Sequence, residues 1–259
     1  MWRGLLLLGV AGAAGLAWAL MPGGGTARGL PSWDWQLSEP FALDRVVDVL
    51  DIDATSVRAA DVAEIKARGT YLICYVSVGT VEAYRRDAGD FPGAVVGRVY
   101  ADWPDEKFLD IRRLDVLMPL MEKRFRRCEE MGFDAIEPDN MDVYQNDSGF
   151  SLSKADTVAY VAALAEMAHG LGLEIGQKNV PELTEDLVGM LDFAIAEACF
   201  DDGWCGALRP YLEAGKPVYA AEYTDTPVNF DAACAEAARL GISMVLKDRD
   251  LTAAYRACE

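Results

Sequence analysis

One structural unit repeats along this chain: a helical pattern, a glycine and then a short apolar segment. The stretches EMGFDAIEP, GLGLEIGQK and RLGISMVLK each show this step from helix through glycine to apolar segment. Short continuous apolar runs are typical of strands that are buried on both faces of a parallel sheet. A glycine directly after a helix takes the left-handed conformation that ends the helix. The repeat therefore predicts an α/β fold in which parallel strands alternate with helices.

Eight apolar segments of this kind follow one another along the chain. They span residues 33–37, 46–52, 71–76, 134–138, 173–177, 193–197, 217–222 and 242–247. Helical patterns cover residues 56–68, 116–131, 154–171, 182–190, 207–214 and 230–240. Eight strands linked by helices match the count and the size of a (β/α)8 TIM barrel, which we expect as a single domain over residues 31–259. An open doubly wound sheet is the alternative, but no glycine-rich phosphate-binding loop follows the first strand.

The charge of the chain limits its partners. Its 24 Lys and Arg residues against 42 Asp and Glu residues give a formal net charge of −18 at pH 7, and the sequence contains no compact basic cluster. Nucleic acid and anionic membrane surfaces are therefore excluded as main partners. The single histidine excludes most His-rich zinc sites, so we expect any catalysis to depend on carboxylates. The acidic excess either serves solubility or attracts a cationic substrate.

The first residues have the pattern of an export signal. One positive charge at Arg3 precedes an uncharged, mainly apolar run over residues 4–20, and small residues at 25–27 permit cleavage before Arg28. Residues 1–27 are thus predicted to be a signal peptide, or a membrane anchor through residues 4–20. Both interpretations place the protein outside the cytoplasm: secreted or periplasmic, or anchored to the membrane and facing outside.

Export permits disulfide bonds, and the chain has six cysteines. Cys199 and Cys205 flank a short loop that a bridge would close, and a bridge between Cys234 and Cys258 would fix the C-terminus. We predict both bridges. Cys74 lies within the apolar run YLICYV, where a buried free thiol is expected. No CxxC pair supports a zinc site.

In barrels of this type the chemistry lies at the C-terminal ends of the strands, so the polar residues there are candidates. Asp139 follows the fourth predicted strand and Glu197 ends the sixth, each after an apolar run that favours partial burial. Hydrolysis of a glycosidic bond needs two carboxyl groups, one as proton donor and the other as nucleophile or base. Burial raises the pKa of a carboxyl group toward the range of a proton donor. Asp139 and Glu197 are therefore the predicted catalytic pair.

Three other roles for the strand-end residues stay open. Either acid can form a buried salt bridge with Lys178 or Lys247. The acids of DID (residues 51–53) or of DNMD (residues 139–142) can hold a divalent cation, because carboxylates suit Mg²⁺, Ca²⁺ and Mn²⁺, although the nearby lysines would oppose one. Lys178, at the end of the fifth strand, can form a Schiff base.

Substrate contacts are predicted for polar and aromatic residues near the same strand ends. Residues 80–113, after the third strand, form the longest break in the repeat, and we expect an irregular loop there that covers the active face. Acids at the mouth of the barrel would bind cationic groups of a substrate, and we assign this role to Asp51, Asp53 and Glu222. The predicted substrate-binding residues are Asp51, Asp53, Tyr75, Trp103, Asp142, Lys178, Glu222 and Tyr223.

Six phrases of the sequence occur in this order: LICYVSVGTVEAYR, WPDEKFLDIR, MGFDAIEPDNMDVY, GLEIGQKNVPEL, FAIAEAC and GKPVYAAEYT. Together they resemble the glycoside hydrolase family 114 barrel, the endo-α-1,4-polygalactosaminidase group, over about residues 31–258. The resemblance implies a secreted (β/α)8 enzyme that acts on partly deacetylated galactosamine-rich polysaccharide. It places the catalytic acids after strands four and six, at Asp139 and Glu197, and implies no metal and no organic cofactor. A cationic polymer would give the acidic charge a use.

Two functions from different classes remain. The first is a secreted endo-glycosidase that hydrolyses α-1,4-linked galactosamine-containing polysaccharide by a two-carboxylate mechanism. The second is a non-catalytic barrel that binds exopolysaccharide at the cell surface. The carboxylate pair favours the enzyme, because a binding module does not need two carboxyl groups on opposite sides of one bond.

Overall fold

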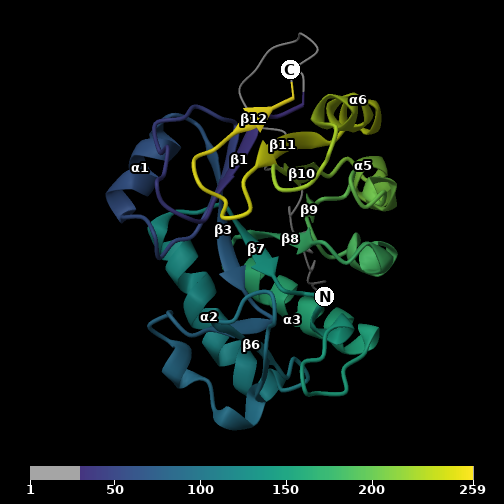
Figure 1. Ribbon diagram of the computed structural model, residues 1–259. Helices are drawn as coiled ribbons and strands as arrows, with labels where there is room; N and C mark the ends of the chain where they lie inside the picture. Colours follow the sequence, from purple (N-terminus) through teal and green to yellow (C-terminus); the bar gives the residue numbers. More distant parts are fainter. Residues whose placement is uncertain (1–29, 259) are drawn as a thin grey trace, which may run out of the picture.

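Eight parallel strands form the wall of a barrel, as the repeat predicts (Figure 1). The computed structural model describes residues 30–258. In spatial order the strands are β1 (Trp33–Gln36), β2 (Val49–Ile52), β3 (Tyr71–Ser77), β7 (Ala135–Asp139), β8 (Glu174–Lys178), β9 (Phe193–Glu197), β10 (Val218–Tyr223) and β11 (Ser243–Lys247). Each strand pairs in parallel with the next, so their C-terminal ends lie at one end of the barrel. The (β/α)8 prediction is confirmed, whereas the predicted leader, residues 1–27, lies outside the described residues.

Helices surround the barrel (Figure 1). They are α1 (Ala59–Ala67), α2 (Leu114–Met131), α3 (Lys154–Gly170), α4 (Thr184–Leu187), α5 (Arg209–Glu213) and α6 (Phe230–Leu240). Residues 37–48 connect β1 to β2 without a helix, and after β11 the chain adds a short antiparallel strand, β12 (Arg256–Ala257). α4 and α5 are shorter than predicted because a 3-10 turn precedes each of them and takes up part of the range. No helix among residues 30–258 is long and apolar enough to cross a membrane.

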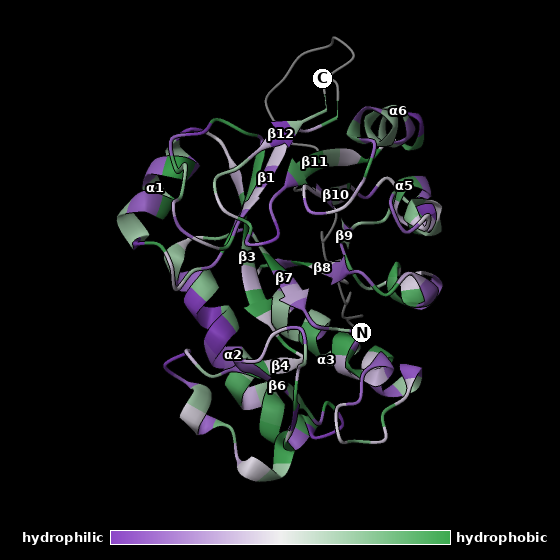
Figure 2. Cartoon of the chain, viewed as in Figure 1, coloured by the Kyte–Doolittle hydropathy of each residue, from purple (hydrophilic) through white to green (hydrophobic). Residues whose placement is uncertain are grey.

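The alternation of side chains along each strand separates two apolar cores. Successive residues of a strand point to opposite faces, so every second residue points into the barrel. Trp33, Phe193 and Tyr219 belong to the interior core, whereas Leu72 and Ile136 belong to the larger core between the strands and the helices. The surrounding helices carry both hydrophobic and hydrophilic residues, as expected for helices with one face on the sheet (Figure 2). The position of a residue in this alternation therefore decides whether it can reach a site inside the barrel.

A buried ion group, and not a strand ladder, closes the seam between β1 and β11. Lys247 Nζ lies 2.8 Å from Asp34 Oδ1, and Arg45 forms an ion pair with the other oxygen of the same carboxylate. Both cations also donate to backbone carbonyl oxygens of the C-terminal segment. Asp34 and Lys247 are fully buried. Lys247 therefore belongs to the seam, where it pairs with Asp34 and not with one of the predicted catalytic acids.

Residues 80–113 are not the irregular loop that we expected. They form a small antiparallel sheet in the order β4 (Thr80–Glu82), β6 (Glu106–Leu109) and β5 (Val96–Val99). Phe108 and Leu109 of β6 are buried and belong to the outer core. The strands have only three or four residues each, so their alternation is too short to stand out in the sequence.

All six cysteines are paired. The predicted bridges Cys199–Cys205 and Cys234–Cys258 are confirmed. The prediction of a free Cys74 is wrong, because this residue is bonded to Cys128. The side chain of Cys74 points out of the barrel toward α2, and the two Cα atoms are 6.1 Å apart, within the range that a disulfide spans. The apolar run around Cys74 predicts burial correctly but does not show that a second cysteine packs against it.

Loss of the Asp34 carboxylate should destabilise the fold strongly. Asp34→Ala leaves the buried ammonium of Lys247 without its counter-charge, and loss of one partner of a buried ion pair costs about 3–5 kcal/mol. The control Asp147→Ala breaks the exposed Arg98–Asp147 pair and should change the free energy of unfolding by less than about 1 kcal/mol. Denaturant unfolding measures both values, and equal effects would show that the ion group does not hold the seam.

Candidate active site

A cavity of about 980 Å³ opens at the C-terminal ends of the strands. Its wall combines strand-end residues with the β5–β6 turn of the small sheet and with the segment after β11. The side chains that line it include Trp35, Asp53, Tyr75, Tyr84, Arg85, Tyr100, Trp103, Glu106, Asp139, Asp142, Lys178, Glu197, Tyr223 and Arg249. A concave site of this size, with several convergent polar groups, is typical of a ligand-binding pocket.

The ammonium group of Lys178 lies at the centre of the site. Its Nζ is 2.6 Å from Asp139 Oδ1, 3.0 Å from Glu137 Oε1 and 3.1 Å from Glu197 Oε2. It also lies 4.6 Å from the ring centre of Trp35, and the side chain is only 3% exposed. Burial alone would lower the pKa of Lys178, but the three carboxylates outweigh it and hold this pKa well above its ordinary value. Lys178 is therefore a permanent cation that joins three strands, β7, β8 and β9.

Glu197 is surrounded by donors. Its Oε2 accepts a hydrogen bond of 2.9 Å from Asn179 Nδ2, and its Oε1 accepts one from the Tyr223 hydroxyl. The backbone N–H of Glu197 donates to Asn179 Oδ1, so the same amide holds the residue from both sides. Burial raises the pKa of Glu197, but Lys178 and these donors outweigh burial and lower the pKa below its ordinary value. The free protein therefore holds Glu197 as a carboxylate.

Asp139 has a similar set of donors. Besides Lys178, it accepts a hydrogen bond of 3.0 Å from the Tyr75 hydroxyl and one of 3.2 Å from Asn140 Nδ2. The structure thus brings the predicted catalytic residues, Asp139 and Glu197, to the two sides of one ammonium group. The buried salt bridge to Lys178 that we considered as an alternative is present, and it includes both acids at once.

The chain turns sharply directly after each of the residues Asp139, Lys178 and Glu197. Asn140, Asn179 and Ala198 follow Asp139, Lys178 and Glu197, and they have φ values of 63°, 52° and 50°. This left-handed conformation is tolerated by asparagine but strains a residue such as alanine, at a cost of order 1–3 kcal/mol. Strain of this kind gathers at functional sites. Here it bends the chain out of the strand at the point where each functional side chain must face the cavity.

Six of the predicted substrate-binding residues line the cavity: Asp53, Tyr75, Trp103, Asp142, Lys178 and Tyr223. Asp53 forms an ion pair with Arg85, so its charge is already neutralised. Asp142 accepts a hydrogen bond from Asn146, and burial raises the pKa of this carboxyl group. Trp103 remains 46% exposed at the mouth, where a flat ring is free to pack on a ligand.

Asp51 and Glu222 do not lie where we predicted. Both are fully buried and neither lines the cavity. Asp51 points into the barrel interior below the cavity and contacts Glu137. Glu222 precedes Tyr223 on β10 and therefore points to the opposite face, where it accepts hydrogen bonds from the backbone N–H groups of Phe200 and Asp201. A strand-end position alone did not reveal these directions.

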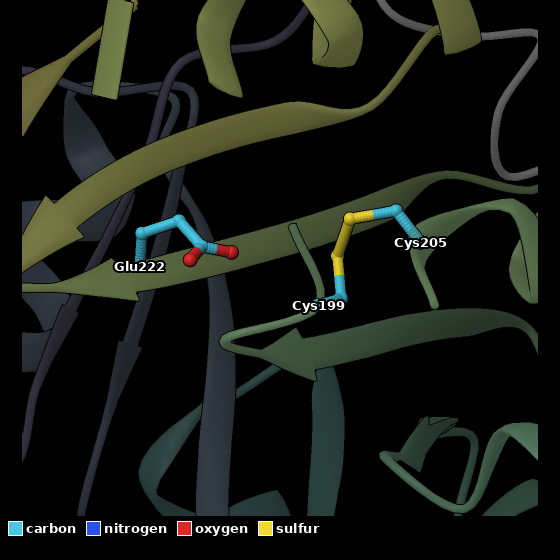
Figure 3. A group of neighbouring side chains, drawn as sticks. All are labelled: Cys199, Cys205 and Glu222. Carbon is cyan, nitrogen blue, oxygen red and sulfur yellow. A yellow bond between two sulfur atoms is a disulfide. The ribbon is translucent and has the colours of Figure 1, made fainter. Parts of the chain in front are cut away.

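The acids that we considered as alternative ligands of a divalent cation are not assembled around a common point. Asp53 is paired with Arg85, and Asp139 with Lys178. Among the described residues, Cys199, Cys205 and Glu222 are the one group of potential ligands close enough to share an ion (Figure 3). The two sulfur atoms are bonded to each other, so they offer no thiolate to a metal.

Several residues of the site were not predicted. Glu137, Asn140 and Asn179 contact the catalytic pair or Lys178. Asn140 and Asn179 each directly follow a predicted site residue in the chain, and this position could have suggested them. Glu106 lines the cavity wall, where burial raises its pKa to about 7. Four exposed acids of the cavity rim form no ion pair with any described residue; we call Asp102, Asp105, Asp202 and Asp250 the rim acids.

Gly79 allows two loops of the site to meet, and its substitution should disturb them. A Cβ atom at Gly79 would lie 1.8 Å from the carbonyl oxygen of Asn140, a backbone atom that cannot yield easily. Gly79→Ala should therefore destabilise the fold by about 1–3 kcal/mol or more. The control Gly89→Ala, in residues 80–113, meets no atom within 4 Å and should be near neutral. Thermal and denaturant unfolding test this, and equal stability of the two variants would contradict the close contact.

Comparison with known proteins identifies the family. The model of glycoside-hydrolase family GH114 matches residues 14–259. An uncharacterized protein of Deinococcus radiodurans is 28% identical over 235 residues, which are 83% of this chain and 75% of that protein. The structure of Aspergillus fumigatus Ega3 in complex with galactosamine has a TM-score of 0.81 and 29% identity, and it covers 88% of this chain and 95% of its own.

The glycoside hydrolase domain of PelA from Pseudomonas aeruginosa has the same fold, with a TM-score of 0.66 and 18% identity over 85% of this chain and 96% of that domain. The match to the family model extends over the whole barrel and therefore includes every residue around Lys178. The protein is a glycoside hydrolase and belongs to family GH114.

Proposed function

We propose that this protein is an exported endo-glycosidase that hydrolyses α-1,4-linked galactosamine-containing polysaccharide, with Asp139 and Glu197 as its catalytic carboxyl groups. The observation that carries the proposal is the bridge of one buried ammonium to both carboxylates, at the C-terminal ends of β7 and β9, in an open cavity. This is where barrel enzymes place their chemistry.

The separation of the two carboxylates supports a retaining mechanism. Lys178 Nζ lies 2.6 Å from one oxygen of Asp139 and 3.1 Å from one oxygen of Glu197. These two nearest oxygens are therefore less than about 6 Å apart, which fits the roughly 5–5.5 Å between the carboxyl groups of retaining enzymes better than the roughly 6.5–9.5 Å of inverting enzymes. At the shorter distance no water fits between the sugar and the second carboxylate, so that carboxylate acts as the nucleophile. The other protonates the leaving oxygen and later activates the water.

The rim acids support a cationic substrate. They are exposed, they have no cationic partner among the described residues, and they surround the mouth of the cavity. They take over the role that we assigned to Asp51 and Glu222. Ega3, at 29% identity, is a protein whose structure contains galactosamine, a sugar that carries an amine. Trp103 at the same rim offers an exposed face on which a sugar ring can stack.

Two features of the chain support export. The first 27 residues carry the composition of a signal or an anchor. Three disulfides in one domain are typical of proteins that fold in an oxidising compartment outside the cytosol. A location outside the cytoplasm would also give the enzyme access to an exopolysaccharide.

Substitution of either catalytic carboxyl group should abolish hydrolysis. Asp139→Asn and Glu197→Gln should each lower kcat by on the order of 10³-fold or more, because one half of the two-carboxylate mechanism is lost. Both variants should stay folded, since Lys178 keeps two carboxylate partners in each. The release of new reducing ends from galactosamine-containing polymer measures activity, with Glu129→Gln on the surface of α2 as control.

Turnover close to that of the wild type in both variants would reject the assignment of the pair. A folded wild-type protein that binds the polymer and releases no reducing ends would instead support the non-catalytic exopolysaccharide-binding barrel.

The charge of the rim should control substrate binding. Added salt should raise KM for a deacetylated polymer, because exposed ion pairs are screened over about 8–10 Å near physiological ionic strength. Full N-acetylation should raise KM as well, since it removes the cation. Asp202→Asn combined with Asp250→Asn should raise KM at low salt by about threefold or more.

The matched control combines Glu129→Gln with Glu130→Gln, which removes the same charge from exposed residues outside the cavity. Its KM should stay close to that of the wild type. Equal KM values for both double variants, at low and at high salt, would refute the electrostatic role of the rim and leave the catalytic assignment intact.

A further inference from the structure

A second pair of acids lies beneath the catalytic pair. Glu137 precedes Asp139 by two residues on β7, so both side chains point into the barrel, and Glu137 lies deeper. Asp51 reaches the same interior from β2 and contacts Glu137 directly. Both acids are fully buried and neither lines the cavity. They are outside the reach of substrate, and the mechanism proposed above does not use them.

Two carboxyl groups in contact cannot both be ionised when they are buried. Among the described residues, no backbone N–H, hydroxyl or amide donates a hydrogen bond to any of their four oxygens. Within residues 30–258, the one cation at ion-pair distance is Lys178, whose Nζ is 3.0 Å from Glu137 Oε1. A proton must therefore lie between the two acids. Because Lys178 stabilises negative charge on Glu137, the proton belongs to Asp51.

We propose that Asp51 is a positioning residue for catalysis: it stays protonated and donates this proton to Glu137, which remains the deep anion that holds Lys178 between Asp139 and Glu197. The inference rests on the proposed catalytic pair for its effect on the reaction. The location of the proton does not depend on that proposal.

Groups from the neighbouring strands set the balance of charge around this pair. Burial, followed by the charge of Glu137, raises the pKa of Asp51 well above its ordinary value, and burial also raises the pKa of Glu137. Lys178 opposes both shifts, while Asp139 adds to them. The titratable or charged groups that face the pair are Tyr75 from β3, Asp139 from β7 and Lys178 from β8, and through Lys178 the charge of Glu197 from β9 and the hydroxyl of Tyr223 from β10 follow.

Substitutions of Asp51 test whether this residue acts as a neutral hydrogen-bond donor or as a negative charge. Asp51→Leu removes the donor, leaves Glu137 without its hydrogen bond and should lower kcat by about tenfold or more with little change in KM. Asp51→Asn supplies a neutral N–H donor of the same shape and should restore kcat to within about threefold of the wild type. An Asp51→Asn variant as inactive as Asp51→Leu would show that the enzyme needs a charge at this position, and would overturn the proposal.

The corresponding substitution at Glu137 should shift the pH profile, whereas the one at Asp51 should not. Glu137→Gln removes the anion, so Lys178 acts on Asp139 and Glu197 alone and their protonated forms become less stable. Both limbs of the pH profile of kcat/KM should therefore move to lower pH, by roughly one unit. Asp51→Asn should leave both limbs in place. The reverse pattern would place the proton on Glu137 and refute the assignment.

Infrared spectroscopy tests the proton without any assay of activity. The difference spectrum of wild type minus Asp51→Asn should contain the carbonyl band of a protonated carboxylic acid, and this band should persist at mildly alkaline pH where exposed acids are ionised. Absence of the band would overturn the proposal even for an active enzyme. Its presence in a protein that hydrolyses no polymer would support the buried proton and refute only the proposed function.

Discussion

The site is organised by one buried ammonium group that faces three carboxylates. An isolated lysine in this position would be too costly to bury in its charged form, and each of the three acids would be costly without it. Because Lys178 draws one oxygen from Glu137, Asp139 and Glu197 to a single point, it fixes the spacing of the catalytic pair to within the length of two ion contacts. The chemistry and the stability of this end of the barrel therefore depend on the same contact.

The alternation of side chains along the strands brings these groups together. Asp139, Lys178 and Glu197 end three neighbouring strands, and each points inward. A left-handed residue follows each of them where the chain leaves the strand, and the three side chains line the open cavity. The strain at Ala198 is the clearest sign of this requirement, since no hydrogen-bonding side chain there eases the conformation.

The strands, the barrel and the position of Asp139 and Glu197 at strand ends could be predicted from the sequence, because all three depend on local patterns: apolar runs, helix-ending glycines and polar residues at strand ends. The face of the sheet to which the Glu222 side chain points could not be predicted, and its neighbour Tyr223 faces the cavity instead. The bond between Cys74 and Cys128 could not be predicted from the sequence either, since it depends on how α2 packs against β3. Short antiparallel strands such as β4 and β5 give too few residues for alternation to show.

The two buried lysines, Lys247 and Lys178, lie in groups of opposite net charge. At the seam, one carboxylate meets two cations, Lys247 and Arg45, and backbone carbonyl oxygens satisfy the positive excess, so nothing further is needed. Around Lys178 the excess is negative, and below the site a shared proton neutralises part of it. On the cavity side, Arg85 and Arg249 are paired with other acids, and the rim acids have no cationic partner among residues 30–258, so they extend the same sign of charge outward. The polymer that we propose as substrate carries ammonium groups and would supply the missing charge, which connects the buried electrostatics of the barrel to the proposed function.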